Sequence, residues 1–319
     1  GAVYLRTVSL SFVLTGFTQI YYGLLKVCDH AGLSSMIGSL AVVLNIALNA
    51  VFIFGLVGMP AMGIAGAALA TVCARIFETI AVIVVVTKYK CPKLGNMFVI
   101  KDREMHKDYW KYTTPLLINQ IGWGGGVTMY SVIMGHMGSD ATAANSIASI
   151  VRTIIASLCW GIAAGVSIII GQTLGQNKLE EAKKMGGKFV RLSIWIGVAS
   201  GLVILALIPL VLHVITLTPQ AMYYLKFMLC MAAYYIIGNS LNSTIISGIF
   251  PAGGDTKFGM VCDVVTLWCF VVPLGMLAAF VWHAPVLLVA FILTLDEFVK
   301  IPAVYIHYMK YKWVKNITR

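Results

Sequence analysis

Charged and amide side chains interrupt the apolar stretches of this sequence at only a few positions. After residue 111 these residues include Asn119, Gln120, Asp263, Asp296, Glu297 and Lys300. A charge in hydrocarbon costs at least about 2.5 kcal/mol, so each one needs a partner, a wet cavity or a route to the interface. A buried carboxyl group can exchange a proton, or trade that proton for sodium or an organic cation. The chemistry that these residue types indicate is therefore cation binding inside a membrane.

Five of these six residues are expected to line one polar pocket. Glu297 lies close to the middle of the last apolar stretch, and Lys300 lies one turn further along. Asn119, Gln120 and Asp263 are expected at a comparable depth from the same side of the membrane as Lys300. Alternatively, Glu297 and Lys300 form only a local ion pair, with the lysine amine reaching the interface. Asp296 points about 100° away from Glu297 on a helix, so one of these two carboxyls is expected to be structural.

Five further polar residues are secondary candidates for lining a cavity. They are Asn45, Asn49, Arg75, Glu78 and Arg152. Arg75 and Glu78 have the spacing of a structural ion pair. Reaching the outer headgroups explains Arg152 as well as lining a cavity does. The two asparagines share one helix face and are expected first to hydrogen-bond between helices.

The elements that must hold these residues are apolar helices. The chain is 60% hydrophobic and 11% charged, with a mean hydropathy of +0.89, which leaves too little polar surface for a soluble globule. About 20 apolar residues span a bilayer, and the runs lack the alternation of a membrane barrel. We therefore expect an all-α polytopic membrane protein with about nine transmembrane helices. The expected helices are residues 4–25, 36–56, 62–87, 112–134, 144–174, 189–215, 221–250, 258–282 and 285–309.

Charge and cysteine usage argue against several other classes of function. The net charge of +11 comes from basic residues at the ends of apolar stretches rather than on one face, so nucleic acid is not an expected partner. The seven cysteines occur singly, without metal-ligand spacing, so neither a metal nor a cofactor is expected. The sequence contains no recognisable set of nucleophile and base, so an enzyme is not expected.

The basic residues alternate between successive loops, which predicts the topology. Positively charged loops lie on the cytoplasmic side of a membrane, and the intervening turns hold almost no Lys or Arg. The C-terminus is therefore expected in the cytoplasm. The predicted parts are a partial lobe of three helices at 1–90, a basic cytoplasmic inter-lobe loop at 91–111, and a six-helix lobe with a basic tail at 112–319.

Short segments recur along the chain at an offset of about 220 to 225 residues, which indicates an internal repeat. Lys26 to Gly32 matches Pro251 to Lys257, and Lys88 to Lys90 matches Lys310 to Lys312. A repeat of six helices would place three more helices before Gly1. The predicted topology also puts Gly1 outside the cell without a Met or a signal peptide. We therefore expect a fragment of a twelve-helix transporter built from two six-helix bundles.

Several stretches resemble one family, the multidrug and toxic compound extrusion (MATE) transporters. The matching stretches are Leu44–Asn49, Phe52–Gly55, Gly58–Ala68, Ala70–Thr71, Arg75, Pro115–Asn119, Gly171–Gly175 and Gly253–Phe258. Together they cover essentially the whole chain and are similar to spans four to twelve of the family. The resemblance implies a monomeric transporter of a cell inner membrane, whose two bundles surround a cavity that opens alternately to each side.

The same resemblance implies that proton or sodium entry drives the export of small organic cations. In many members a carboxylate follows the asparagine of the seventh span, but Gln120 occupies that position here and cannot titrate. No sodium site is assigned to particular residues. An organic cation would also bind to aromatic faces and soft apolar walls. The side chains that offer them are Trp123, Met129, Tyr130, Trp160, Tyr234, Tyr235 and Trp268.

Two other functions are kept as alternatives. A flippase for a lipid-linked saccharide or a similar amphiphile would share the bundle and the large cavity, but more interior Arg and Lys would favour it. A membrane scaffold without transport activity has no reason to keep carboxylates inside its helices.

The turn at Gly253–Thr256 resembles phosphate-binding loops in composition. It lacks the Lys-Ser/Thr pair and the preceding strand that a nucleotide site requires. We expect this turn to reverse the chain and to cap the following helix through Asp255 or Thr256.

Overall fold

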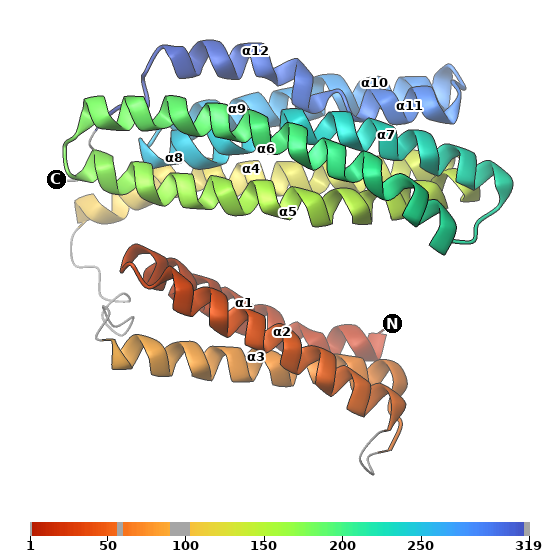
Figure 1. Ribbon diagram of the computed structural model, residues 1–319, viewed down its shortest axis with the longest axis horizontal. Helices are drawn as coiled ribbons and strands as arrows, with labels where there is room; N and C mark the ends of the chain where they lie inside the picture. The colour runs from red at the N-terminus through yellow and green to blue at the C-terminus, as the bar shows by residue number, and fades with distance from the viewer. Residues whose placement is uncertain (1, 56–59, 90–102, 316–319) are drawn as a thin grey trace. The chain divides into compact units, whose positions relative to one another are not determined.

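The protein is described by a computed structural model that covers residues 2–55, 60–89 and 103–315, with helices and connecting turns and no strand among them (Figure 1). The prediction of an all-helical protein is confirmed. Helices are the expected outcome, because a chain in lipid must satisfy its backbone N–H and C=O groups internally. The chain divides into two compact units, residues 1–103 and 104–319.

The first unit contains three helices, α1 (Ala2–Val27), α2 (Ala31–Phe54) and α3 (Gly63–Lys88). Both α1 and α2 pack mainly against α3. The end of α2 is set by Gly55, whose φ of 70° lies in the left-handed region that glycine adopts most readily. A Cβ atom on Gly66 would lie 2.5 Å from the Phe52 carbonyl oxygen, so this glycine permits the close approach of α2 and α3.

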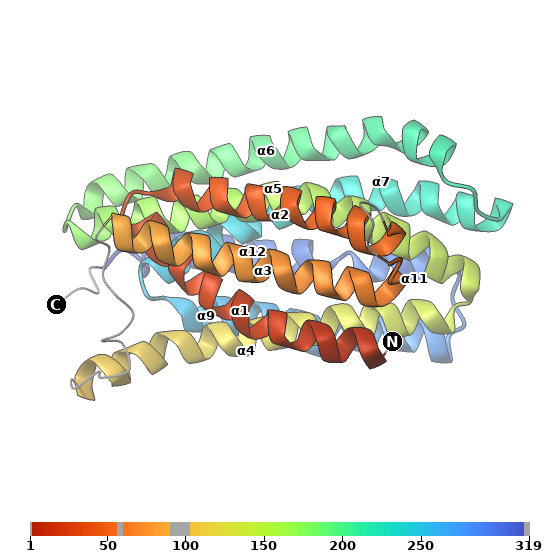
Figure 2. The same cartoon turned by 90° about the horizontal axis from the view of Figure 1, so that it is seen from below.

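The second unit packs its helices side by side, as the views in Figures 1 and 2 show. Two of its helical segments contain π-helical turns, the first after α7 and the second after both α9 and α10. The elements are α4 (Arg103–His136), α5 (Ser139–Gly175), α6 (Leu179–Val214), α7 (Pro219–Asn242), η3 (Ser243–Ile249), α8 (Phe250–Ala252), α9 (Thr256–Val265), η4 (Thr266–Val271), α10 (Val272–Met276), η5 (Leu277–Val281), α11 (Val286–Leu293) and α12 (Asp296–Met309).

Seven helical segments of the described chain are long and apolar enough to cross a membrane. They are Arg6–Val27, Ala31–Phe54, Gly63–Lys88, Ser139–Gly175, Leu179–Val214, Pro219–Ala252 and Thr256–Val281. The fourth and ninth predicted spans are helical but are not among these seven, so the count of nine spans stays a prediction. Helix α4 begins at Arg103, within the expected loop at 91–111, while residues 90–102 lie outside the described residues.

The expectation of one continuous last helix at 285–309 is wrong. Helix α11 ends at Leu293 and α12 begins at Asp296. Between them Thr294 and Leu295 form tighter turns, in which each N–H donates to the carbonyl three residues earlier. This interruption places Glu297 in the first turn of a half-helix rather than in the middle of a long one.

The segment after α12 folds back onto the helices. Trp313 is completely buried, and its ring stacks on Tyr308 with the ring centres 5.7 Å apart and the planes 10° apart. A Cβ atom on Gly253 would lie only 1.7 Å from the Trp313 carbonyl oxygen, so only glycine fits in the turn between α8 and α9. The described part of the basic tail, which ends at Lys315, is thereby fixed against this turn.

Candidate functional site

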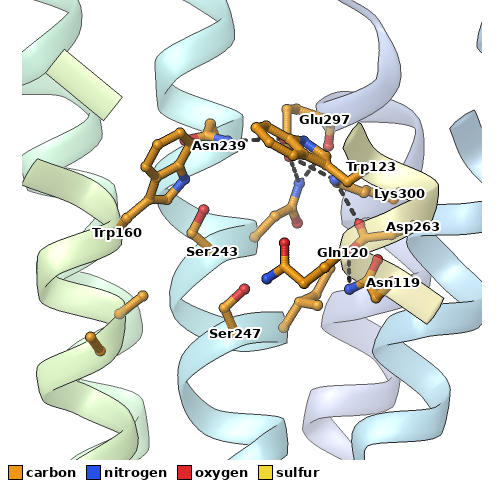
Figure 3. A pocket seen from close by; sticks show the side chains of 14 residues that line it. Asn119, Gln120, Trp123, Trp160, Asn239, Ser243, Ser247, Asp263, Glu297 and Lys300 are labelled. Carbon is orange, nitrogen blue, oxygen red and sulfur yellow. Dashed lines mark hydrogen bonds and ion pairs between the residues drawn. The ribbon is translucent and has the colours of Figure 1, made fainter. Parts of the chain in front are cut away.

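A polar cavity of about 340 Å³ lies within the second unit, between α4, α5, α7 with η3, α9 and α12 (Figure 3). The five residues that were expected to share one pocket all lie around it. Its walls are formed by Asn119, Gln120, Trp123, Trp160, Ala163, Ala164, Asn239, Asn242, Ser243, Ile246, Ser247, Asp263, Glu297 and Lys300. This volume lies within the range of small-molecule sites, about 300 to 1,000 Å³.

Glu297 is the most completely hydrogen-bonded carboxylate in the cavity. Its side chain is buried, and Oε1 accepts hydrogen bonds from Tyr235 Oη at 3.2 Å and Asn239 Nδ2 at 3.0 Å. The amide of Asn242 donates to Oε2 at 2.8 Å and also to the Glu297 backbone carbonyl at 2.7 Å. Three side chains of α7 therefore hold one carboxylate of α12, which compensates for the water that burial removes.

Lys300 connects Glu297 to the opposite wall of the cavity. Its Nζ lies 3.1 Å from Glu297 Oε2 and 2.8 Å from Asp263 Oδ1. The second oxygen of Asp263 accepts a hydrogen bond from Asn119 Nδ2 at 3.0 Å. Figure 3 shows this chain of contacts, which joins α12, α9 and α4. Two carboxylates share one ammonium group, so the network has one negative charge in excess.

The local backbone favours a carboxylate at the position of Glu297. The break after α11 brings it into the first turn of α12, where the positive end of the helix dipole favours a carboxylate. On the facing wall, α7 passes into the π-helical segment η3 directly after Asn242. Single π-helical turns within α-helices are frequent at functional sites.

Two tryptophans form an aromatic wall beside the charged network. Trp123 and Trp160 meet edge to face, with ring centres 6.0 Å apart and planes at 87°. Indole faces attract organic cations by about 0.5 to 2 kcal/mol. The wall therefore offers the type of surface that a hydrophobic cation would require.

The other aromatic candidates have structural positions. Trp268 donates its indole N–H to the Gly122 carbonyl at 3.0 Å, across the contact between α4 and η4. Tyr234 stacks on Phe298 with ring centres 3.8 Å apart. Tyr235 reaches the cavity only through its hydrogen bond to Glu297.

Asp296 lies outside the cavity wall, unlike its neighbour Glu297. It is buried, and its Oδ1 atom has no hydrogen-bond partner among the described residues. Arg152 stands 5.0 Å from the centre of the Tyr235 ring and lines a separate cavity of about 90 Å³ together with Tyr130. Asp296 and Arg152 are therefore not among the residues that line the cavity of Glu297, although Tyr235 contacts both Glu297 and Arg152.

In the first unit, Arg75 and Glu78 form the expected ion pair at 2.5 Å. The Tyr22 hydroxyl also donates to the buried Glu78 carboxylate at 2.7 Å. Arg75, Glu78 and Asn45 line a cavity of about 100 Å³. Asn49 donates to Asn45 at 3.0 Å, so these two bond along one helix rather than between helices.

Sequence reasoning missed the uncharged polar residues of the cavity. Asn239, Asn242, Ser243 and Ser247 lie on α7 and η3 and had no place among the candidates. The cluster of amides and hydroxyls at 239–244, inside an otherwise apolar span, is the feature that would have found them. No group of His, Cys, Asp and Glu that could hold a metal ion occurs in the described part of the chain.

A family model described as MatE matches residues 115–308, which is more than half of the chain. The chain belongs to the MatE family. The probable multidrug resistance protein YoeA of Bacillus subtilis (strain 168) is 29% identical over 243 residues, covering 73% of this chain and 51% of YoeA. The probable multidrug resistance protein NorM of Thermotoga maritima is 22% identical over 272 residues, covering 85% and 58%. The chain therefore spans about half the length of the curated relatives it matches.

Solved MATE structures have the same fold. A MOP superfamily transporter from Pyrococcus furiosus matches with a TM-score of 0.85 at 16% identity, covering 98% of this chain and 70% of that one. The Vibrio cholerae MATE transporter VcmN in its bent form matches with a TM-score of 0.80, also at 16% identity, covering 97% and 69%. These matches confirm the resemblance and the all-α polytopic membrane fold. Members of the MatE family are transporters and not enzymes.

Proposed function

We propose that the protein is a secondary active efflux transporter that exchanges small organic cations for protons or sodium by alternating access. The observation that supports this proposal is the excess negative charge of the Glu297, Lys300 and Asp263 network beside the wall of Trp123 and Trp160. A site with one uncompensated carboxylate can hold either a coupling ion or an organic cation. Because each ligand weakens the binding of the other, inward movement of the ion releases the substrate outward.

In this mechanism Glu297 and Asp263 are the coupling groups and Lys300 positions them. The ammonium group of Lys300 contacts both carboxylates, so loss of negative charge from one strengthens its pairing with the other. Asn119 orients Asp263, and the three donors on α7 orient Glu297. Gln120 contributes a hydrogen-bonding surface rather than a titrating group.

The names of related proteins support export of drugs, because YoeA and NorM are described as probable multidrug resistance proteins. We place the protein in a cell inner membrane with a cytoplasmic C-terminus, because the tail and the alternating loops are basic. A monomer is the expected form. The modest cavity and its negative excess charge support a small cation over a lipid-linked saccharide as the cargo, so the flippase and the scaffold remain the weaker alternatives.

Ethidium efflux from cells that express the protein from its native gene tests the proposal. The proton and sodium gradients are collapsed separately, and the Glu297→Gln variant is compared with Glu181→Gln, which changes an exposed carboxylate on α6. We expect gradient-dependent efflux that Glu297→Gln abolishes and Glu181→Gln leaves intact, at equal expression. If gradient-dependent efflux survives Glu297→Gln, the coupling group must instead be Asp263 or a residue outside this cavity. No efflux from well-expressed protein would favour the flippase.

A further inference from the structure

A separate pocket of about 190 Å³ lies where α8 turns into α9. Three segments that are distant in sequence meet there, namely the start of α4, the turn itself and the basic tail. The pocket is lined by Lys111, Tyr112, Gly254, Asp255, Thr256, Lys257 and Lys315. Three lysines and one aspartate give these walls a formal charge of +2.

The turn that lines this pocket leads into a helix start without a side-chain cap. Helix α9 begins at Thr256, and the first N–H groups of a helix have no acceptor within the helix and lie at the positive end of its dipole. Asp255 occupies the N-cap position but makes no side-chain cap hydrogen bond. Its Oδ2 atom instead lies 2.7 Å from His307 Nε2. The expectation that Asp255 or Thr256 caps this helix is therefore wrong.

The hydroxyl of Thr256 supplies an independent indication of a ligand. Thr256 is only 5% exposed and lines the pocket, and its Oγ1 has no hydrogen-bond partner among the described residues. A buried hydroxyl without a partner costs about 1 to 3 kcal/mol. A ligand that accepts hydrogen bonds would satisfy this group and the amides of α9 together.

The pocket is built on rigid parts of the molecule. Trp313 is completely buried against the turn, and the Lys315 N–H donates to its carbonyl at 3.0 Å. The His307 ring stacks on Phe258, with centres 3.6 Å apart. This stacking fixes the imidazole that bonds to Asp255 on one side of the pocket. The lysine of the tail is thereby kept beside the turn.

We propose that this pocket binds a phosphate group, through the Thr256 hydroxyl, the first amides of α9 and the ammonium groups of Lys111, Lys257 and Lys315. Oxyanions bind where helix N-termini, hydroxyls and lysines converge. The Asp255 carboxylate is the unfavourable element, but its Oδ2 is bonded to His307. The phosphate belongs either to an anionic lipid headgroup or to free inorganic phosphate. The pocket lies at the start of the candidate span Thr256–Val281, where headgroups meet the protein.

Binding is measured on the purified protein in detergent with two probes, phosphatidic acid in mixed micelles and inorganic phosphate. The first variant changes Lys111, Lys257 and Lys315 together to Gln. Its matched control changes Lys178, Lys184 and Lys188 to Gln, which removes the same charge from exposed lysines on α6 and its cap. Thr256→Val removes only the hydroxyl, and thermal unfolding of every variant verifies that it is folded.

We expect saturable binding of at least one probe. The Lys111, Lys257 and Lys315 triple variant should bind the probe at least tenfold more weakly, and Thr256→Val should lower the affinity by about tenfold. The control triple variant should change the affinity less than twofold. Binding of phosphatidic acid that millimolar inorganic phosphate does not displace would identify a lipid headgroup as the source, whereas comparable binding of inorganic phosphate would identify the free ion. Equal losses in the two triple variants, unchanged binding in Thr256→Val, or no binding of either probe would overturn the proposal.

Discussion

Asp296 and Glu297 are consecutive residues of α12, yet their carboxylates have opposite surroundings. Glu297 accepts hydrogen bonds from three side chains and forms an ion pair with Lys300. The Oδ1 atom of Asp296 has no hydrogen-bond partner in the described part of the chain, although the residue is buried. Two consecutive carboxylates of one helical turn therefore differ in how completely they are hydrogen-bonded.

The first prediction compares these two neighbours. Glu297→Gln removes one charge of a buried ion pair and should lower the free energy of unfolding by about 3 kcal/mol. Asp296→Asn should change it by less than about 1 kcal/mol, because its Oδ1 atom makes no hydrogen bond to lose. Thermal or denaturant unfolding in detergent measures both. Equal destabilisation by the two variants would show that the hydrogen bonds of Glu297 do not set its contribution to stability.

The second prediction concerns the contact between Lys300 and Asp263. A double-mutant cycle with Lys300→Met and Asp263→Asn should give a coupling free energy of at least about 1 kcal/mol, because the ion pair at 2.8 Å is largely buried. The exposed pair of Lys183 and Glu180, also at 2.8 Å, is the control and should show no measurable coupling. A coupling free energy of zero between Lys300 and Asp263 would show that their ion pair contributes nothing to stability and would contradict the network.

The third prediction gives the sign of the pH dependence. An organic cation requires the excess negative charge of the cavity, so its affinity should fall as the pH is lowered and protons neutralise the carboxylates. Quenching of Trp123 or Trp160 fluorescence by a bound cation reports the affinity, and Trp123→Phe with Trp160→Phe identifies the signal. Glu297→Gln should bind at least tenfold more weakly and respond less to pH. Binding that strengthens as the pH falls would contradict cation exchange at this site.

The fourth prediction tests the docking of the tail. Gly253→Ala places a Cβ atom on the Trp313 carbonyl oxygen, and relief of this clash should cost about 2 kcal/mol or more and expose the tail to proteolysis. Gly187→Ala on α6 is the control, because no atom lies within 4 Å of its added Cβ, and this helical site should gain up to about 1 kcal/mol. Digestion times and unfolding midpoints check both variants. An unchanged tail in Gly253→Ala would show that the turn can shift at little cost.

Residue type and position along each predicted helix were sufficient to predict one shared pocket. The cavity is lined by all five of its predicted residues, Asn119, Gln120, Asp263, Glu297 and Lys300. Apolar length also located the seven helical segments that are candidates for crossing a membrane, because the bilayer sets that length directly. These features depend on position along a helix, which a sequence displays.

The break between α11 and α12 was not predictable in the same way. No proline or glycine marks Thr294 and Leu295, and the proline nearby, Pro302, lies inside α12 without ending it. The role of Asp255 was also missed, because its partner His307 is 52 residues away and competes with the local cap. Both features are decided by tertiary contacts, which local propensity does not contain.

Trp313 follows α5 to α12 in the sequence but fills a core that includes residues of α5, α6, η3, α8 and α12. During synthesis these helices leave the ribosome before the ring that completes their packing. The space that Trp313 fills in this core therefore stays empty until residue 313 has been synthesised, so packing at this end of the second unit is completed late. A chain that ends before residue 313 would retain an apolar opening at that end of the second unit.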